Sequence, residues 1–343
     1  MRLGIRLGLL FAIACWLTAV PLPAPAQNSA PQSASQQAGS QQQQDQEPLE
    51  TFKVDVNVVS LYFNVKDKKG ALIPSLKKED FQVFEDGKPQ TIKYFTAESN
   101  QPLTLGLMID TSGSQTRVLP FEQEAGSQFL RDVLRDKDLA FVISFDVNVE
   151  LLQDFTSSGQ SLRAALNRAR VNTGGGSGGV PGIGQGPVPV SRPRGTLLYD
   201  AIFLGSDEKL KQEVGRKAMI ILTDGEDQGS QISVRDAIEA AQKSDAICYV
   251  LLIEDNAQYN GFGAGEMKKL AQETGGRVIE VGNESKKLRE AFQQISNELR
   301  SQYSIGYTPT NQKHDGTYRK VEIKTTAEGF KVQSRKGYYA TKQ

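Results

Sequence analysis

Asp110, Ser112 and Ser114 stand together in the run LGLMIDTSGS, where they offer one carboxylate and two hydroxyls. The apolar stretch before them is typical of a strand that is covered on both faces and ends where the small polar residues begin. Carboxylate and hydroxyl oxygens are hard donors, which suit Mg²⁺, Mn²⁺ or Ca²⁺ better than zinc or copper. Asp and Ser also serve in ordinary turns and helix caps, so this run alone does not establish a metal site.

Two distant segments carry further oxygen donors in similar surroundings. Thr196 lies in RGTLLYDAI, after a Gly-rich stretch and before a helical pattern. Asp224 ends a second apolar run, in AMIILTDGED. Because the carboxyl ends of parallel strands meet at one edge of a sheet, the three loops could converge there.

With these pieces in this order, residues 102–300 resemble a von Willebrand factor type A domain with a complete metal-ion-dependent adhesion site. The resemblance implies a divalent cation, Mg²⁺ or else Mn²⁺ or Ca²⁺, that grips an Asp or Glu carboxylate of a partner protein. It implies an adhesion or protein-binding module and no enzyme. The ligands that it implies are Asp110, Ser112, Ser114, Thr196 and Asp224.

Two other functions use the same donors. A purely structural ion would make the protein a scaffold. A metal-dependent hydrolase or phosphotransferase is the enzymatic alternative, since an Asp at a strand end can accept a phosphoryl group. The only histidine, His314, lies outside the domain, and the chain has no Gly-x-x-x-x-Gly-Lys loop. Glu226 and Asp227 could act as a base, but acids in such a loop are more often merely solvated.

The amino terminus predicts export. Residues 1–26 combine a basic start at Arg2 and Arg6, an apolar core over 7–20 and the small-residue site Ala24-Pro25-Ala26, which is the pattern of a secretory signal. We therefore expect a periplasmic or extracellular protein with no integral membrane span after cleavage. The chain has 40 basic and 40 acidic residues and no basic stripe, so a nucleic-acid partner is not expected.

The expected domains follow from shifts in composition. A signal over 1–26 precedes a disordered Gln- and Ser-rich linker over 27–50. A β flank over 51–101 and another over 301–343, which holds the stretch Gly337 to Ala340, surround the domain at 102–300. Such flanks resemble those of exported bacterial proteins of the same type. Each is too small to fold alone, so we expect one small β-sandwich built from both. Its expected interior includes Phe81, Phe84, Tyr303, Tyr307 and Tyr318.

Alternating patterns over 102–300 predict an α/β fold, a Rossmann-like doubly wound and mostly parallel sheet. A turn at Asp86-Gly87 predicts a hairpin in the first flank. The segment Gly174 to Gly195 is too rich in Gly and Pro for regular structure and predicts a mobile insertion, or else a lid beside Thr196. Strands are expected over 105–110, 139–146, 149–154, 217–223, 246–253 and 277–280. Helices are expected over 119–135, 159–169, 196–211, 233–243, 264–274 and 284–300.

Overall fold

The computed structural model describes residues 58–97, 100–171, 195–253 and 262–342, which belong to one compact unit. The expected signal and linker, and the Gly/Pro-rich segment up to residue 194, lie outside these residues. Among the helices that are described, none has the length and apolar character needed to cross a membrane.

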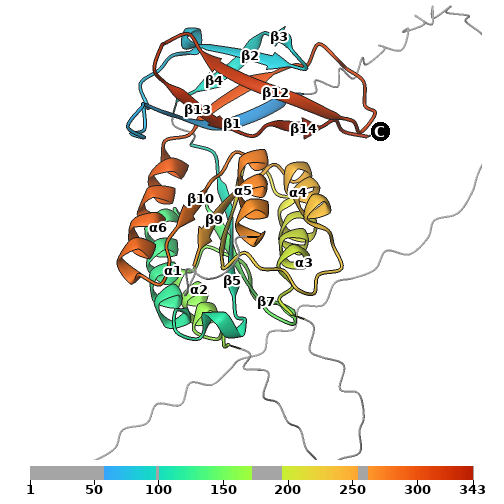
Figure 1. The fold of residues 1–343 in the computed structure, drawn as a ribbon. Helices are drawn as coiled ribbons and strands as arrows, with labels where there is room; N and C mark the ends of the chain where they lie inside the picture. Colours follow the sequence, from blue (N-terminus) through green and yellow to red (C-terminus); the bar gives the residue numbers. More distant parts are fainter. Residues whose placement is uncertain (1–57, 98–99, 172–194, 254–261, 343) are drawn as a thin grey trace, which may run out of the picture. The chain divides into compact units, whose positions relative to one another are not determined.

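A six-stranded sheet forms the centre of the α/β part, in the order β10-β9-β8-β5-β6-β7 (Figure 1). Its neighbouring strands are parallel, except that β7 runs antiparallel to β6 at one edge. Every residue of β5, β8 and β9 is buried, which explains why these strands are largely apolar in sequence. The strands are β5 Leu103–Asp110, β6 Leu139–Phe145, β7 Val149–Thr156, β8 Arg216–Thr223, β9 Ala246–Leu252 and β10 Val278–Glu280.

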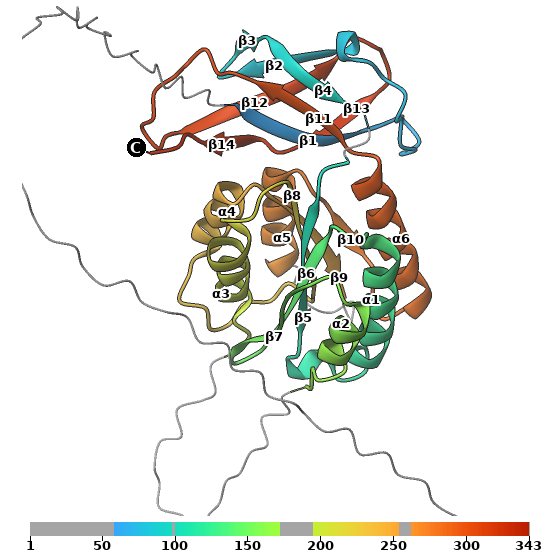
Figure 2. The ribbon, with the colours of Figure 1, turned by 180° about the vertical axis from the view of Figure 1, so that it is seen from behind.

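Helices cover both faces of this sheet, as Figures 1 and 2 show from opposite sides. One face packs against α1 (Leu119–Val133), α2 (Gly159–Leu166) and α6 (Ser285–Arg300). The other packs against α3 (Leu198–Phe203), α4 (Val234–Lys243) and α5 (Phe262–Thr274). The helix expected over 196–211 begins as α3 and continues as a π-helix, η3 (Leu204–Leu210). The doubly wound, mostly parallel fold predicted from the sequence is confirmed.

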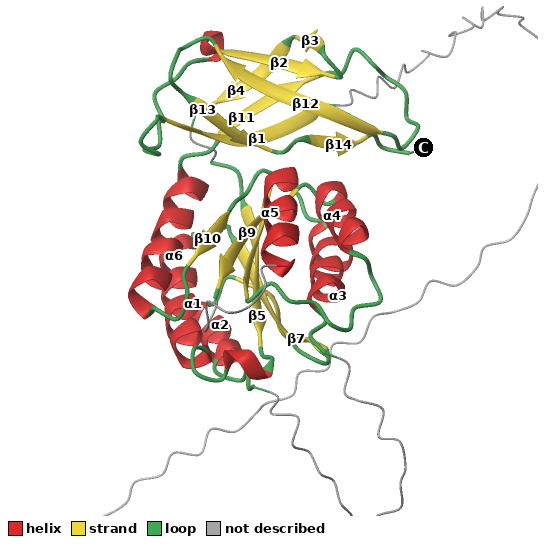
Figure 3. Cartoon of the chain, in the orientation of Figure 1, coloured by secondary structure: helices red, strands yellow, loops and turns green. Residues whose placement is uncertain are grey.

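The two flanks form a pair of four-stranded antiparallel sheets, ordered β13-β1-β11-β4 and β14-β12-β2-β3 (Figure 3). Each sheet contains strands from both ends of the chain, and one apolar cluster lies between them. The predicted sandwich of mixed origin is therefore confirmed. Its strands are β1 Val59–Lys66, β2 Phe81–Glu85, β3 Lys88–Gln90, β4 Ile92–Thr96, β11 Tyr303–Tyr307, β12 Tyr318–Thr325, β13 Lys331–Ser334 and β14 Gly337–Tyr339.

The hairpin at Asp86-Gly87 is also confirmed, with φ angles of 48° and 79° that suit a tight two-residue turn. Two side chains expected inside the sandwich were assigned to the wrong face. Phe84 is only partly buried, under the Lys324 ammonium group, and Tyr318 is 38% exposed. Successive residues of a strand face opposite sides, so with Phe81 buried, Phe84 must point outward.

Candidate metal centre

The candidate site lies where two adjacent parallel strands end. After β5 the chain forms β6 on one side, and it later returns to form β8 on the other side of β5. The strand order therefore reverses between β5 and β8, and open α/β sheets bind ligands at the carboxyl ends of such a pair. Ile109 pairs with Leu222 in this ladder, so Asp110, the last residue of β5, and Asp224, the residue directly after β8, lie at the ends of neighbouring strands.

Hydrogen bonds join four of the predicted residues into one cluster. Asp110 accepts from the Ser112 backbone N–H at 2.9 Å. The Ser112 and Ser114 hydroxyl oxygens lie 2.9 Å apart, and the Ser114 hydroxyl donates to Asp224 at 2.7 Å. The second Asp110 oxygen accepts from the Thr223 hydroxyl at 2.8 Å. These hydrogen bonds thus join the loop after β5 to the end of β8 and the loop that follows it.

Thr196 belongs to a third loop, which backbone bonds attach to the loop after β8 and to the residue that follows β6. Its carbonyl accepts from the Gln228 N–H at 3.0 Å, which ties it to the loop after β8. The next residue, Leu197, donates its N–H to the carbonyl of Asp146 at 2.8 Å. Thr196 itself is 8% exposed. The Thr196 loop therefore adjoins the carboxyl ends of β6 and β8.

Asp146 is a member of this region that the sequence analysis missed. It follows β6, and its carboxylate accepts from the Thr111 hydroxyl at 3.1 Å, beside Asp110. Together with the bond from Leu197, this contact positions the Thr196 loop against the end of β5. An acid directly after the apolar run LAFVISF is the signal that could have identified it, as it did Asp110 and Asp224.

Asp227 holds the loop after β8 in place instead of facing solvent freely. Its Oδ1 accepts from the Ser230 hydroxyl at 2.5 Å and from the Tyr199 N–H at 3.2 Å. The expectation of a merely solvated acid is therefore wrong for this residue. Because these bonds fix its carboxylate at the start of α3, Asp227 serves the loop structure and is poorly suited to act as a base. Glu226 accepts from the Gln228 side chain at 3.0 Å.

The electrostatics of the cluster are dominated by its two acids. Asp110 is fully buried, and burial is the main cause that raises the pKa of its carboxyl to about 7, with the Asp224 charge adding to the effect. A buried carboxyl group whose ionisation is disfavoured by burial and by a neighbouring acid is one that a cation would stabilise in its ionised form.

The donor set fits a hard divalent ion. Two carboxylates and the hydroxyls of two serines lie in one hydrogen-bonded cluster, without sulfur or imidazole. Within the described ranges, no three His, Cys, Asp or Glu side chains gather closely enough to form a metal cluster. An ion here would be held by the two acids together with the serine hydroxyls.

Comparison with solved structures gives neighbours of low sequence identity. One is a von Willebrand factor type A protein from Catenulispora acidiphila, with 13% identity, a TM-score of 0.43, and 85% of this chain and 76% of that chain covered. Another is BatB from Bacteroides thetaiotaomicron, with 20% identity, a TM-score of 0.43, and 58% and 100% covered.

A third neighbour is proximal thread matrix protein 1 from the mussel byssus, whose structure has a zinc-occupied MIDAS motif. It shares 16% identity, with a TM-score of 0.46 and coverage of 63% of this chain and 50% of that chain. No protein-family model and no curated protein matches this chain.

Proposed function

We propose that this protein is an exported adhesion or protein-binding module that uses a divalent cation to bind an acidic group of a partner protein. Asp110, Ser112, Ser114, Thr196 and Asp224 would hold the ion, with Mg²⁺ as the first candidate and Mn²⁺ or Ca²⁺ as the others. The bound ion would supply an open coordination position for a partner's Asp or Glu carboxylate.

The observation that carries this proposal is the continuous hydrogen-bonded cluster from Asp110 through Ser112 and Ser114 to Asp224. Its oxygens come from two strand ends that are far apart in sequence and adjacent in the sheet. Each serine hydroxyl can exchange its present hydrogen bond for a bond to a cation. The strands that precede the two loops are fully buried, which fixes the position of the loops. The chain's own residues thus preorganise the donors before any ion binds.

The same geometry argues against the phosphotransferase alternative. The Asp110 carboxylate is 0% exposed and accepts a hydrogen bond on each oxygen, so it is poorly placed to attack a phosphoryl group. His314 lies in the loop before β12, in the sandwich, and so offers no base to the α/β part. A binding site needs neither an exposed nucleophile nor a base.

Calorimetric titration with Mg²⁺ tests the ion. Asp110→Ala and Asp224→Ala should each abolish binding, because these two side chains carry all the formal charge of the proposed ligand set. Asp110→Asn provides an isosteric variant, and Asp136→Ala, at an exposed position outside the cluster, is the matched control. Circular dichroism should show that the variants remain folded. Unchanged titration curves for the Asp110 and Asp224 variants would disprove the assignment.

Capture of a protein from the native extracellular fraction tests the function. Wild-type protein should retain a partner in Mg²⁺ and lose it in EDTA, whereas Asp110→Ala should fail in both. If the wild type instead hydrolyses a small phosphoester and Asp110→Ala does not, the enzymatic alternative is correct.

A further inference from the structure

Glu122 is a buried acid that the proposed ligand set does not use. It lies on α1 in a stripe of buried residues that also holds Leu119, Ala125, Phe129 and Val133. Its side chain is 0% exposed, and among the described residues neither carboxylate oxygen has a hydrogen-bond partner. An ionised carboxylate without a partner is costly inside a protein, so such a group stays protonated unless a positive charge lies near it.

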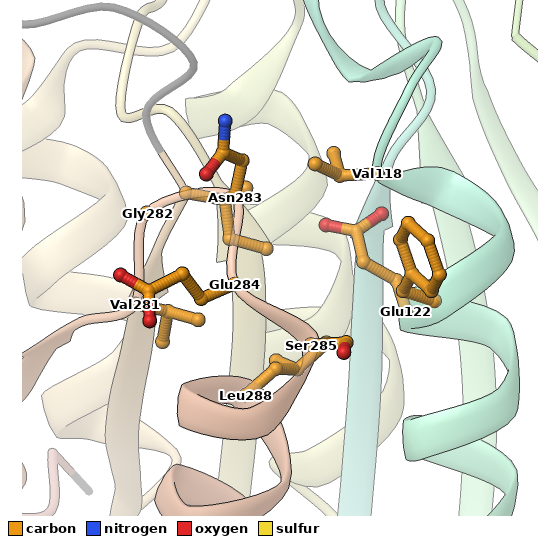
Figure 4. Close-up of a pocket in the computed structure, with 10 residues that line it drawn as sticks. Val118, Glu122, Val281, Gly282, Asn283, Glu284, Ser285 and Leu288 are labelled. Atoms are coloured by element: carbon orange, nitrogen blue, oxygen red, sulfur yellow. The ribbon is translucent and has the colours of Figure 1, made fainter.

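The carboxyl group points into a small cavity between α1 and the loop that precedes α6 (Figure 4). The cavity measures about 10 Å³, which is space for roughly one water molecule and not for an organic ligand. Val118, Val281 and Leu288 give it largely apolar walls. The polar lining residues Asn283 and Ser285 carry no charge, so no cationic side chain among the described residues lines the cavity to neutralise an ionised Glu122.

The cavity adjoins the candidate metal centre. Ile253, another lining residue, donates its N–H to the carbonyl of Thr223 at 2.9 Å, directly before Asp224. Burial raises the pKa of Glu122 well above its usual range, and the charges of Asp110 and then Asp224 raise it further. The remaining acid at the cavity is Glu284, at the start of α6. The cavity that holds Glu122 thus borders the strand end that carries Asp224.

We propose that Glu122 is a third carboxylate beside the cation site. Its negative charge would strengthen ion binding, although its side chain lies outside the ligand set. This inference rests on the proposed metal site. No cluster of three acids close enough to coordinate one ion occurs in the described part of the chain, so Glu122 is assigned no direct contact with the ion. A divalent cation at the strand ends would supply the positive charge that this buried acid lacks, and Glu122 would in turn hold the ion more tightly.

Glu122→Gln tests the proposal because it removes the charge and keeps the shape. We expect Mg²⁺ affinity to fall by roughly tenfold or more, because the attraction between a buried negative charge and a divalent cation is lost. In EDTA the variant should unfold at the same temperature as the wild type or at a higher one, because the cost of the buried acid is gone. Glu124→Gln, on the same helix with a side chain that is 68% exposed, is the matched control.

Two measurements separate this role from a structural one. If Glu122→Gln binds Mg²⁺ like the wild type while Asp110→Ala does not bind it, the inference fails and the metal site stands. If the wild type itself binds no ion, both fail. Glu122→Met provides a second, uncharged variant. Failure of both Glu122 variants to fold in EDTA would show that the residue is structural and would overturn the proposal.

Discussion

At the scale of single residues, Asp110 links the structure of the site to its chemistry. Its carboxylate accepts hydrogen bonds from the Ser112 N–H and the Thr223 hydroxyl. It is also the most deeply buried of the proposed ligands. With a pKa raised to about 7 by burial and by Asp224, it carries a proton in more than half of the free molecules at any pH below that value. A cation must displace this proton in order to bind.

Mg²⁺ affinity should therefore be full above the pKa of Asp110 and decrease as the pH falls through it. For one displaced proton and a pKa of about 7, the loss between pH 8 and pH 6 is about tenfold. In the metal-free protein, stability depends on pH in the opposite direction. A raised pKa means that the folded state binds the proton more tightly than the unfolded chain, so the stability of the metal-free protein should fall as the pH rises from about 4 to about 7.

Titration calorimetry at several pH values, with thermal unfolding in EDTA and in Mg²⁺, measures both effects. Asp110→Asn should lose the ion and should also flatten the pH dependence of the metal-free stability. An Mg²⁺ affinity that stays constant from pH 8 to pH 6 would contradict this account of Asp110.

Individual residues also show where sequence reasoning reaches its limit. The acids at the ends of β5 and β8 were predictable, because an apolar run that ends in Asp is a local signal. Glu122 was missed, although an acid in an otherwise apolar helical stripe is visible in the sequence. Its significance depends on distances to Asp110 and Asp224, which no local pattern contains.

At the scale of elements, the loop after β8 is placed by the close approach of two backbones. Gly225 follows Asp224 and adopts φ 86°, a conformation that favours glycine. A Cβ atom on Gly263, near the start of α5, would lie 2.0 Å from the carbonyl oxygen of Gly225. The backbone of α5 thus packs directly behind the loop that carries Asp224.

Gly263→Ala should consequently displace the loop and weaken Mg²⁺ binding by an amount comparable to loss of a ligand contact, even though Gly263 is no ligand. Gly265→Ala is the control on the same helix, since a Cβ there meets nothing within 4 Å. Removing a helical glycine should stabilise this control by about 0.5–1 kcal/mol. Calorimetry and thermal unfolding of both variants check the result, and equal Mg²⁺ affinities would show that α5 does not position Asp224.

The elements of the α/β part were largely predictable because each has its own periodicity and its own boundaries. Which side chains of the sandwich strands point inward was not predictable from the sequence. Glu85 points inward beside Val83, where its carboxylate accepts from the hydroxyls of Tyr307 and Tyr338, each at 2.8 Å. These partners come from the other end of the chain, together with Arg319 at 3.7 Å. Only the tertiary fold makes a buried acid acceptable at this position.

At the scale of the whole molecule, the two flanks depend on each other strand by strand. β1 pairs with β11 on one side and β13 on the other, and β2 pairs with β12. All three partners belong to the carboxyl-terminal flank, whereas the six strands of the α/β sheet lie within residues 103–280. The sandwich therefore requires both ends of the chain, and the central sheet requires neither.

Deletion of residues 303–343 should make the segment 58–96 sensitive to protease while the α/β part stays resistant. Without its partners, β1 has no neighbouring strand, and Leu61, Phe63 and Phe81, now at most 5% exposed, lose the opposing Tyr303 and Tyr307. Limited proteolysis followed by mass spectrometry locates the cuts. A chain that lacks only residues 341–343 keeps every described strand and should resist like the full protein. If 58–96 is as resistant in the long deletion as in the intact chain, the two flanks fold separately and their pairing is dispensable.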